Sequence, residues 1–195
     1  ISACDKVIET QPDLEPNFED VFKIANNWGK DYLWSVPSNT LGGSILPGAS
    51  LENKAWGKYN GWGYFAPTLD LYESYEESDL RRDATLLAFG DEFVFFGETR
   101  KYWSTNNLTG FQLKKYMEPY SYADGIHVNG NGDHPTTDLN VPLMRLSNIY
   151  LMRAEAKIRL DENGDADLNT VRRRAGLSDV TGATLNHVKK ERRAE

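Results

Sequence analysis

The strongest hydrophobic pattern of the chain lies between residues 140 and 160, where apolar side chains recur at helical spacing. They follow one another at three- and four-residue steps: Leu146, Ile149, Met152 or Arg153, Ala156 and Leu160. Because charged residues occupy positions between them, the spacing predicts an amphipathic helix. Asp138, Pro142 and Ser147 predict an extended lead-in with a candidate N-cap, and Asn163-Gly164 predicts a stop that tolerates positive φ.

A second helix is predicted almost directly after the first. Its apolar stripe is formed by Ala166, Leu168, Val171 and Ala175. Gly176 stands where a C′ glycine ends a helix. Since the connection is short, the two helices are expected to form an antiparallel hairpin.

Shorter elements are predicted along the rest of the chain. They are helices over residues 1–10, 18–26 and 67–77, a strand over residues 32–37, two short strands around Gly90-Asp91 within residues 84–96, and an extended segment over residues 111–116. The second of these helices would share one apolar face among Phe18, Val21, Phe22 and Ala25. Residues 38–63, which are rich in Gly, Ser, Asn and Pro, and residues 120–138 are predicted to be loops.

Three sequence blocks resemble the C-terminal signature of the SusD/RagB family. They are PLMRLSNIYLMRAEA at residues 142–156, NTVRRRAGL at residues 169–177 and ERRAE at residues 191–195. A single block of this kind occurs in many tetratricopeptide-like proteins, so the resemblance depends on all three standing in the family's order. In the family, the last block opens a final helix. Two further segments are weaker matches: YEESDLRRDAT at residues 75–85 and DLEPNFEDVF at residues 13–22.

The resemblance implies a mainly α-helical fold, with tetratricopeptide-like helix pairs, a loop-rich C-terminal subdomain and a few short strands. The whole chain, residues 1–195, would be a single SusD-like C-terminal region. Residues 1–10 would end a preceding helical scaffold, residues 38–137 would form the loop-rich subdomain, and residues 138–195 would form the helical hairpin and a truncated final helix. The chain is therefore expected to be a piece of a longer protein.

The resemblance also implies a function. Members of the family are non-enzymatic lipoproteins of Bacteroidetes on the extracellular face of the outer membrane, anchored through an N-terminal cysteine that this chain does not contain. They capture oligosaccharides or peptides and deliver them to a SusC-like TonB-dependent transporter, without a cofactor. Three alternatives stay open: a peptide-capturing lid, a scaffold that docks on the transporter, and, less favoured, a glycoside hydrolase.

Composition narrows the class of partner. The chain is 39% hydrophobic and 26% charged, which is typical of a globular protein. Its net charge of −7 and pI near 5.1 argue against a nucleic-acid partner, because phosphate binding requires clustered Lys and Arg. The basic run Arg172-Arg173-Arg174 is interpreted as a solvated helix face near a C-terminus. A single cysteine excludes an internal disulfide framework.

Aromatic residues provide the candidate ligand site. The chain has five Trp and ten Tyr, more rings than a core of this size is expected to hide. We predict a site at the end of the first loop, where glycines alternate with rings: Trp56, Tyr59, Asn60, Trp62 and Tyr64. Rings stack on the apolar faces of sugars, and Asn exchanges hydrogen bonds with hydroxyl groups. The alternative is that these rings pack the loop onto the helical scaffold.

Catalytic and metal-binding patterns are weak. The sequence contains no nucleophile elbow and no phosphate-binding loop. Carboxylates that a glycosidase would need are present, but those at residues 73–79 are expected on a solvated helix face, and Asp79 with Arg81 or Arg82 is predicted to form a structural ion pair. His127, His134 and His187 lack further ligands at zinc spacing. The calcium-like runs that start at Asn129 and Asp161 lack the required Gly and Glu, so no metal site is predicted.

Overall fold

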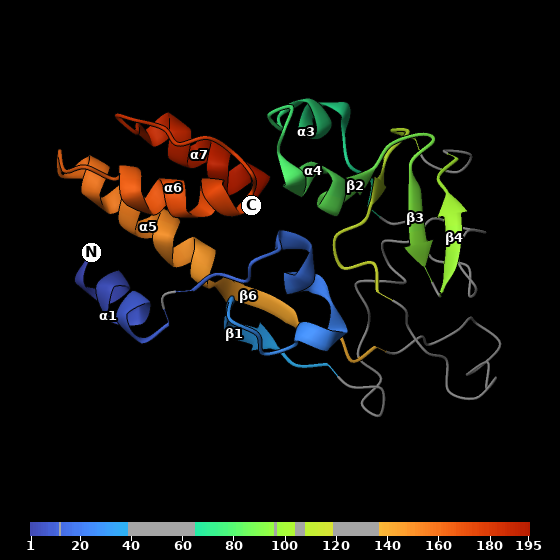
Figure 1. Cartoon of the computed structure of the whole chain (residues 1–195), viewed down its shortest axis with the longest axis horizontal. Helices are drawn as coiled ribbons and strands as arrows, with labels where there is room; N and C mark the ends of the chain where they lie inside the picture. The colour runs from blue at the N-terminus through green and yellow to red at the C-terminus, as the bar shows by residue number, and fades with distance from the viewer. Residues whose placement is uncertain (12, 39–64, 96, 104–107, 119–136) are drawn as a thin grey trace.

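The computed structural model describes residues 1–11, 13–38, 65–95, 97–103, 108–118 and 137–195. Three helices near the C-terminus stack on one another at one end of the molecule (Figure 1): α5 (Leu146–Arg159), α6 (Asp165–Arg174) and α7 (Leu185–Ala194). The α1 helix (Ser2–Thr10) lies against α5. The predicted helix over residues 1–10 and the predicted α5–α6 hairpin are thus confirmed, and the fold is mainly helical.

The core of this helical group is built from side chains of all three C-terminal helices. Its buried members are Leu146, Ile149, Tyr150, Leu151, Ala154, Leu168, Val171 and Val188. The predicted stripe of α5 was partly wrong, because Met152 and Leu160 are exposed while Leu151 and Ala154 are fully buried. The buried face is displaced because α1, α6 and α7 all pack on α5, so its neighbours decide which positions are covered.

Two glycines close the α5–α6 hairpin in different ways. Gly176 has a φ of +77°, as predicted for the residue that ends α6. The positive φ after α5 belongs to Asp161 instead of Gly164. Gly164 is needed for a different reason, since a Cβ atom there would lie 2.8 Å from the main-chain oxygen of Ala154. The absent side chain therefore allows α6 to start close against α5.

A two-stranded ribbon lies below the helical group. Strand β1 (Tyr32–Val36) confirms the predicted strand and pairs antiparallel with β6 (Val141–Arg145), which leads directly into α5. The predicted extended lead-in is thus a strand, and α5 begins at Leu146 with no side-chain cap. Two 3-10 helices precede the ribbon, η1 (Phe18–Phe22) and η2 (Ile24–Asn26), where one α-helix was predicted.

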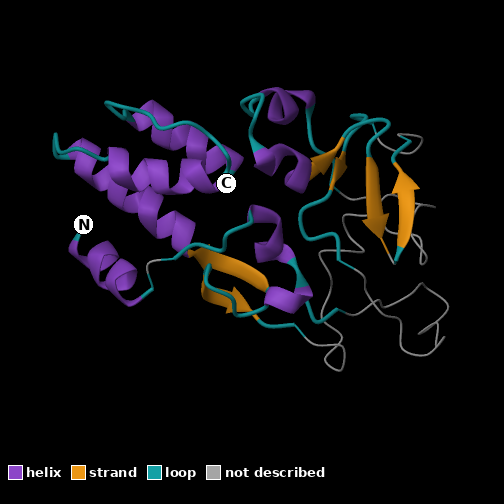
Figure 2. Cartoon of the chain, viewed as in Figure 1, coloured by secondary structure: helices purple, strands orange, loops and turns teal. Residues whose placement is uncertain are grey.

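Next to the helical group, in the middle of the molecule (Figure 2), lie α3 (Leu69–Glu73) and α4 (Leu80–Thr85). The remaining strands are β2 (Leu86–Leu87), β5 (Gln112–Leu113), β3 (Glu92–Phe95) and β4 (Glu98–Lys101), and the last two lie at the end farthest from the helical group. The predicted hairpin around Gly90-Asp91 was wrong, because β3 pairs with β4 and β2 pairs with β5. Residues 84 and 85 complete α4, whose N-cap Asp79 accepts a hydrogen bond from the main-chain nitrogen of Arg81. No helix in the described ranges has the length and apolar character needed to cross a bilayer.

Candidate functional site

The residues predicted to contact a ligand, Trp56, Tyr59, Asn60, Trp62 and Tyr64, lie outside the described residues, so their role stays a prediction. The run starting at Asn129, with His127 and His134, also lies outside them. Within the part of the chain that the structure describes, no three His, Cys, Asp or Glu side chains are grouped so that they could hold a metal ion. His187 caps α7 instead, by accepting a hydrogen bond at Nδ1 from the main-chain nitrogen of Thr184 at 3.1 Å.

A pocket of about 360 Å³ opens among η1, α4, β3 and the segment after β5. Its walls mix rings with charged groups, including Phe22, Phe93, Lys114, Tyr116, Glu19 and Glu118. Phe22 and Phe93 are almost completely buried, so Tyr116 is the accessible ring among these three. An apolar wall with a few polar groups is the mixture expected for a small-ligand site. This pocket could not be predicted from local sequence patterns, because its lining comes from four separate segments.

Contacts between these segments hold the walls of the pocket in place. Lys114 Nζ lies 3.2 Å from Glu19 Oε1. Glu118 Oε2 accepts a hydrogen bond from the main-chain nitrogen of Ile24 at 3.0 Å. Burial raises the pKa of Glu118, although this hydrogen bond opposes the shift. The charged lining is therefore fixed by partners within the fold and is available to orient a polar ligand.

Lys115 connects the pocket to the interior. Its ammonium nitrogen lies 4.4 Å from the centre of the Phe22 ring and donates a hydrogen bond to the main-chain oxygen of Glu195 at 2.9 Å. Burial and, after it, the positive charge of Arg145 together lower the pKa of Lys115 to about 7. The Lys115 amine is therefore partly neutral at physiological pH, which is unusual for a lysine.

This depressed pKa predicts a pH dependence of stability. Between pH 10.5, the ordinary lysine value, and pH 7, the unfolded chain binds a proton at Lys115 that the folded protein does not bind. Folded stability must therefore fall as the pH falls through that window and level off below pH 7. We expect the protein to be more stable at pH 9 than at pH 7, by roughly 2 kcal/mol relative to Lys115→Met. Urea unfolding of both proteins at the two pH values checks this, and parallel profiles would contradict it.

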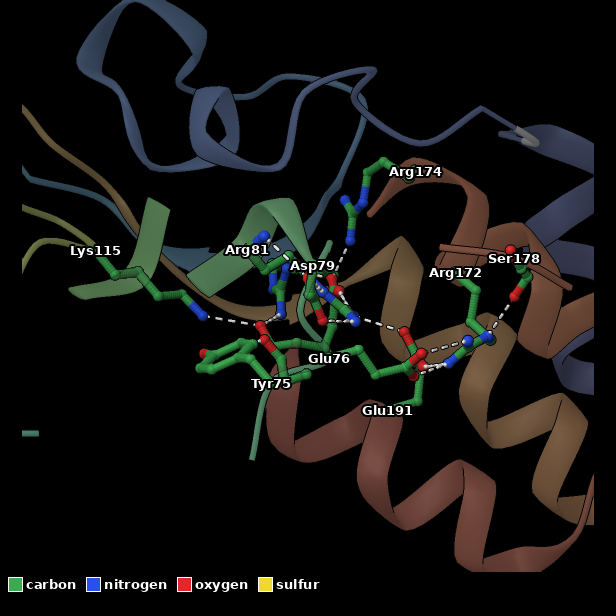
Figure 3. Close-up of polar contacts among 12 residues, drawn as sticks. Tyr75, Glu76, Asp79, Arg81, Lys115, Arg172, Arg174, Ser178 and Glu191 are labelled. Carbon is green, nitrogen blue, oxygen red and sulfur yellow. Dashed lines mark hydrogen bonds and ion pairs between the residues drawn. The ribbon is translucent and has the colours of Figure 1, made fainter. Parts of the chain in front are cut away.

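A buried ion network lies beside Lys115 (Figure 3). At its centre is Arg81, which is 1% exposed. Its guanidinium donates to both carboxylate oxygens of Asp79, at 2.9 Å and 2.7 Å. A third nitrogen lies 2.6 Å from Glu191 Oε1 and 3.1 Å from Glu195 Oε2. The predicted ion pair between Asp79 and Arg81 is thus confirmed. The contacts of Arg81 with Glu191 and Glu195 join α4 to α7.

The Glu195 carboxylate also forms ion pairs with arginines from other elements. Arg145, the last residue of β6, lies 2.9 Å from Glu195 Oε1, and Arg174 at the end of α6 binds the same carboxylate. Burial opposes ionisation of Glu195, but the charges of Arg174, Arg145 and Arg81 outweigh it and hold its pKa well below the usual range. Arg174 also lies 2.9 Å from Asp31, which directly precedes β1. One carboxylate therefore ties α4, α6, α7 and the ribbon together.

The basic run of α6 was misinterpreted as a solvated face. Arg173 is exposed and pairs with Asp179, as expected for such a face, but the side chains of Arg172 and Arg174 are only 10% and 3% exposed. Arg172 donates to Glu76 at 2.7 Å and to Glu191 at 3.2 Å. Their acidic partners lie far away in sequence, so the run alone did not reveal this role.

The prediction that the block ERRAE opens a helix was wrong. The α7 helix begins at Leu185 with a Thr184 capping box, six residues before Glu191. This position explains why Glu191 is buried while Arg192 and Arg193 are not. Glu191 and Glu195 lie four residues apart and face Arg81 together.

Comparison with known proteins places the whole chain in a family. A model of the SusD family matches residues 19–195. The chain belongs to the SusD family. It is 28% identical to a SusD-like protein from Bacteroides ovatus, over 94% of this chain and 35% of that protein. This relative agrees with the family match across nearly the whole sequence.

Solved structures share the fold of this SusD-family chain. A surface glycan-binding protein A from Bacteroides thetaiotaomicron, in complex with laminarihexaose, superposes with a TM-score of 0.74 at 23% identity, over 98% of this chain and 45% of that protein. A structure with a xylogluco-oligosaccharide superposes with a TM-score of 0.72 at 27% identity, over 93% of this chain and 38% of that protein. The chain thus spans less than half the length of each of these relatives.

Proposed function

We propose that the protein captures oligosaccharides without cleaving them, at the extracellular face of the outer membrane, and delivers them to a SusC-like TonB-dependent transporter. The observation that carries this proposal is the family match over residues 19–195, joined to the likeness of this chain to two proteins whose structures hold oligosaccharides. Attachment to the membrane would use a lipidated cysteine in a part of the protein that precedes this sequence.

The chemical character of the pocket and of the ring-rich stretch at residues 56–64 supports a role in ligand binding. Carbohydrate recognition needs rings for the apolar sugar faces and polar groups for the hydroxyls. The pocket among η1, α4 and β3 supplies the partly exposed Tyr116 ring beside Lys114 and Glu118. Residues 56–64 add Trp56, Trp62 and other rings in a glycine-rich stretch. We propose that residues 56–64 form the principal contact surface.

The test is a titration of the full-length protein with soluble oligosaccharides and peptides, with product analysis. We expect saturable binding of a glycan without cleavage, and a loss of affinity of about tenfold or more in Trp56→Ala/Trp62→Ala, since each stacking ring contributes about a kcal/mol. Trp34→Ala, which removes an exposed ring from β1, is the matched control and should bind normally.

Three other results would change the proposal. Cleavage products would revive the glycoside hydrolase. Binding of peptides alone would favour a peptide-capturing lid. Failure to bind either class, with retained association with the transporter, would favour a docking scaffold, because tetratricopeptide-like helix pairs also serve as protein-binding surfaces.

A further inference from the structure

Two aromatic side chains meet at the open base of the β3–β4 hairpin. Phe89 precedes β3 and Trp103 follows β4, and their ring centroids are 5.0 Å apart at an interplanar angle of 76°. Main-chain hydrogen bonds fix this base: Gly90 donates to Tyr102 and Tyr102 donates to Asp91, both at 2.8 Å. The pairing of the hairpin therefore presents the two rings side by side as one edge-to-face corner.

Both rings stay exposed although the hairpin has a buried side. Phe89 is 63% exposed and Trp103 is 49% exposed, whereas Phe93, Phe95 and Tyr102 on the same hairpin are almost completely buried. Complete burial of a large apolar side chain stabilises a fold by about 1.5–3 kcal/mol. Phe89 and Trp103 do not contribute this full stabilisation, because they are only partly buried. Their exposed surfaces are therefore available for contact with a ligand.

Charged groups surround the exposed corner. Lys101 Nζ lies 5.2 Å from the centre of the Trp103 ring. Glu92 stands directly opposite Lys101 in the register of β3 and β4, and both residues are exposed. Asp91 accepts a hydrogen bond from the main-chain nitrogen of Ala88 and completes the turn before β3. The corner thus combines aromatic surface with a cation and a carboxylate, which can bind hydroxyl groups as donor and acceptor.

We propose that Phe89 and Trp103, with Lys101 and Glu92 at the rim, form a second contact surface for a pyranose unit of a bound glycan. The small aromatic area favours a single sugar unit as the occupant over a protein partner. Two partly exposed rings offer at most about 300–500 Å², whereas a stable protein interface buries about 800 Å² on each side. The proposal deepens the proposed function and rests on it, but it concerns residues separate from the Trp56–Tyr64 stretch.

The experiment compares Phe89→Ala/Trp103→Ala with the unaltered full-length protein in isothermal titrations against the glycan that the unaltered protein binds. We expect a three- to tenfold loss of affinity for each ring removed. Lys101→Met should give a smaller loss. Trp34→Ala, a 64% exposed ring in the β1–β6 ribbon, should leave the affinity unchanged. The urea midpoints of all variants should match that of the unaltered protein, because the replaced side chains are exposed.

The outcomes separate this inference from the proposed function. If the unaltered protein binds no glycan, the proposed function fails and the second surface fails with it. If the unaltered protein binds and Phe89→Ala/Trp103→Ala binds equally well, only the second surface is overturned. An equal loss in Trp34→Ala would also overturn it, because the effect would then not belong to the hairpin.

Discussion

Replacing Arg81 by methionine is expected to destabilise the protein by about 3–5 kcal/mol, because one partner of a buried ion network would be removed. Asp79 would lose both of its guanidinium hydrogen bonds, and Glu191 would lose its contact at 2.6 Å. Each carboxylate is almost completely buried, so water cannot replace the lost partner. Since domains are stable by only about 5–15 kcal/mol, this single change should remove a large share of the total.

The loss of stability in Arg81→Met should also depend on pH. Burial raises the pKa of Glu191, and Arg81 opposes that rise. Without Arg81, the Glu191 carboxylate should bind a proton at higher pH than it does now. The folded variant then takes up a proton that the unaltered protein does not, so its deficit in unfolding free energy should narrow as the pH falls from 8 to 5.

Arg82→Met is the matched control, since Arg82 is the next residue and also belongs to α4. It pairs with Asp83, whose side chain is 78% exposed, at 3.0 Å. A surface pair of this kind contributes only about 0–1 kcal/mol. Urea unfolding of both variants measures the difference. Similar losses for Arg81→Met and Arg82→Met would contradict the assignment of Arg81 as the centre of a buried network.

The Arg81 network illustrates how far the sequence could predict this fold. Asp79 and Arg81 are two residues apart, and a capping position followed by a helix already predicted their pairing. Glu191 and Glu195 lie more than a hundred residues further along, so their contact with Arg81 depends on packing that no local pattern encodes. For the same reason, Arg172 and Arg174 looked like solvated charges, although each of them contacts a buried carboxylate, Glu191 or Glu195.

The strands show the same contrast between local features, which the sequence predicts, and contacts between distant segments, which it does not. A strand over residues 32–37 was predicted from the local sequence, but its partner Val141–Arg145 became identifiable only in the structure, where the two segments pair. The hairpin was misplaced because Gly90, with a φ of +95°, marks a real turn that joins strands of different sheets. A glycine predicts the turn and leaves open which strands pair across it.

The two candidate ligand surfaces differ in whether their residues are close in sequence. The ring-rich stretch from Trp56 to Tyr64 was identified because its residues are consecutive, and it stays a prediction. Phe89 and Trp103 are fourteen positions apart and became one surface only through the register of β3 and β4. Proximity that is created by strand pairing is invisible to a search for local aromatic clusters.

Leu151→Ala is expected to cost about 2–5 kcal/mol, the range measured for removing a leucine side chain from a packed core. Leu151 is completely buried in α5 and belongs to the cluster that α5 shares with α6 and α7. Leu151 belongs to the block at residues 142–156 that resembles the family signature. The loss of stability therefore measures how much this part of the signature contributes to core packing. Urea unfolding at neutral pH provides the free energy.

Met152→Ala tests the predicted apolar face of α5 directly, because the hydrophobic spacing had placed Met152 or Arg153 on the buried face. In the structure Met152 is 38% exposed, and alanine is at least as good a helix former. Its loss should therefore stay within about 0.5 kcal/mol, as for most surface substitutions. A larger cost for Met152→Ala than for Leu151→Ala would mean that α5 is rotated about its axis relative to the structure. The Arg153 contacts with Asp167, at 2.6 Å and 3.0 Å, would then also have to break, so Arg153→Met would show little effect in that case.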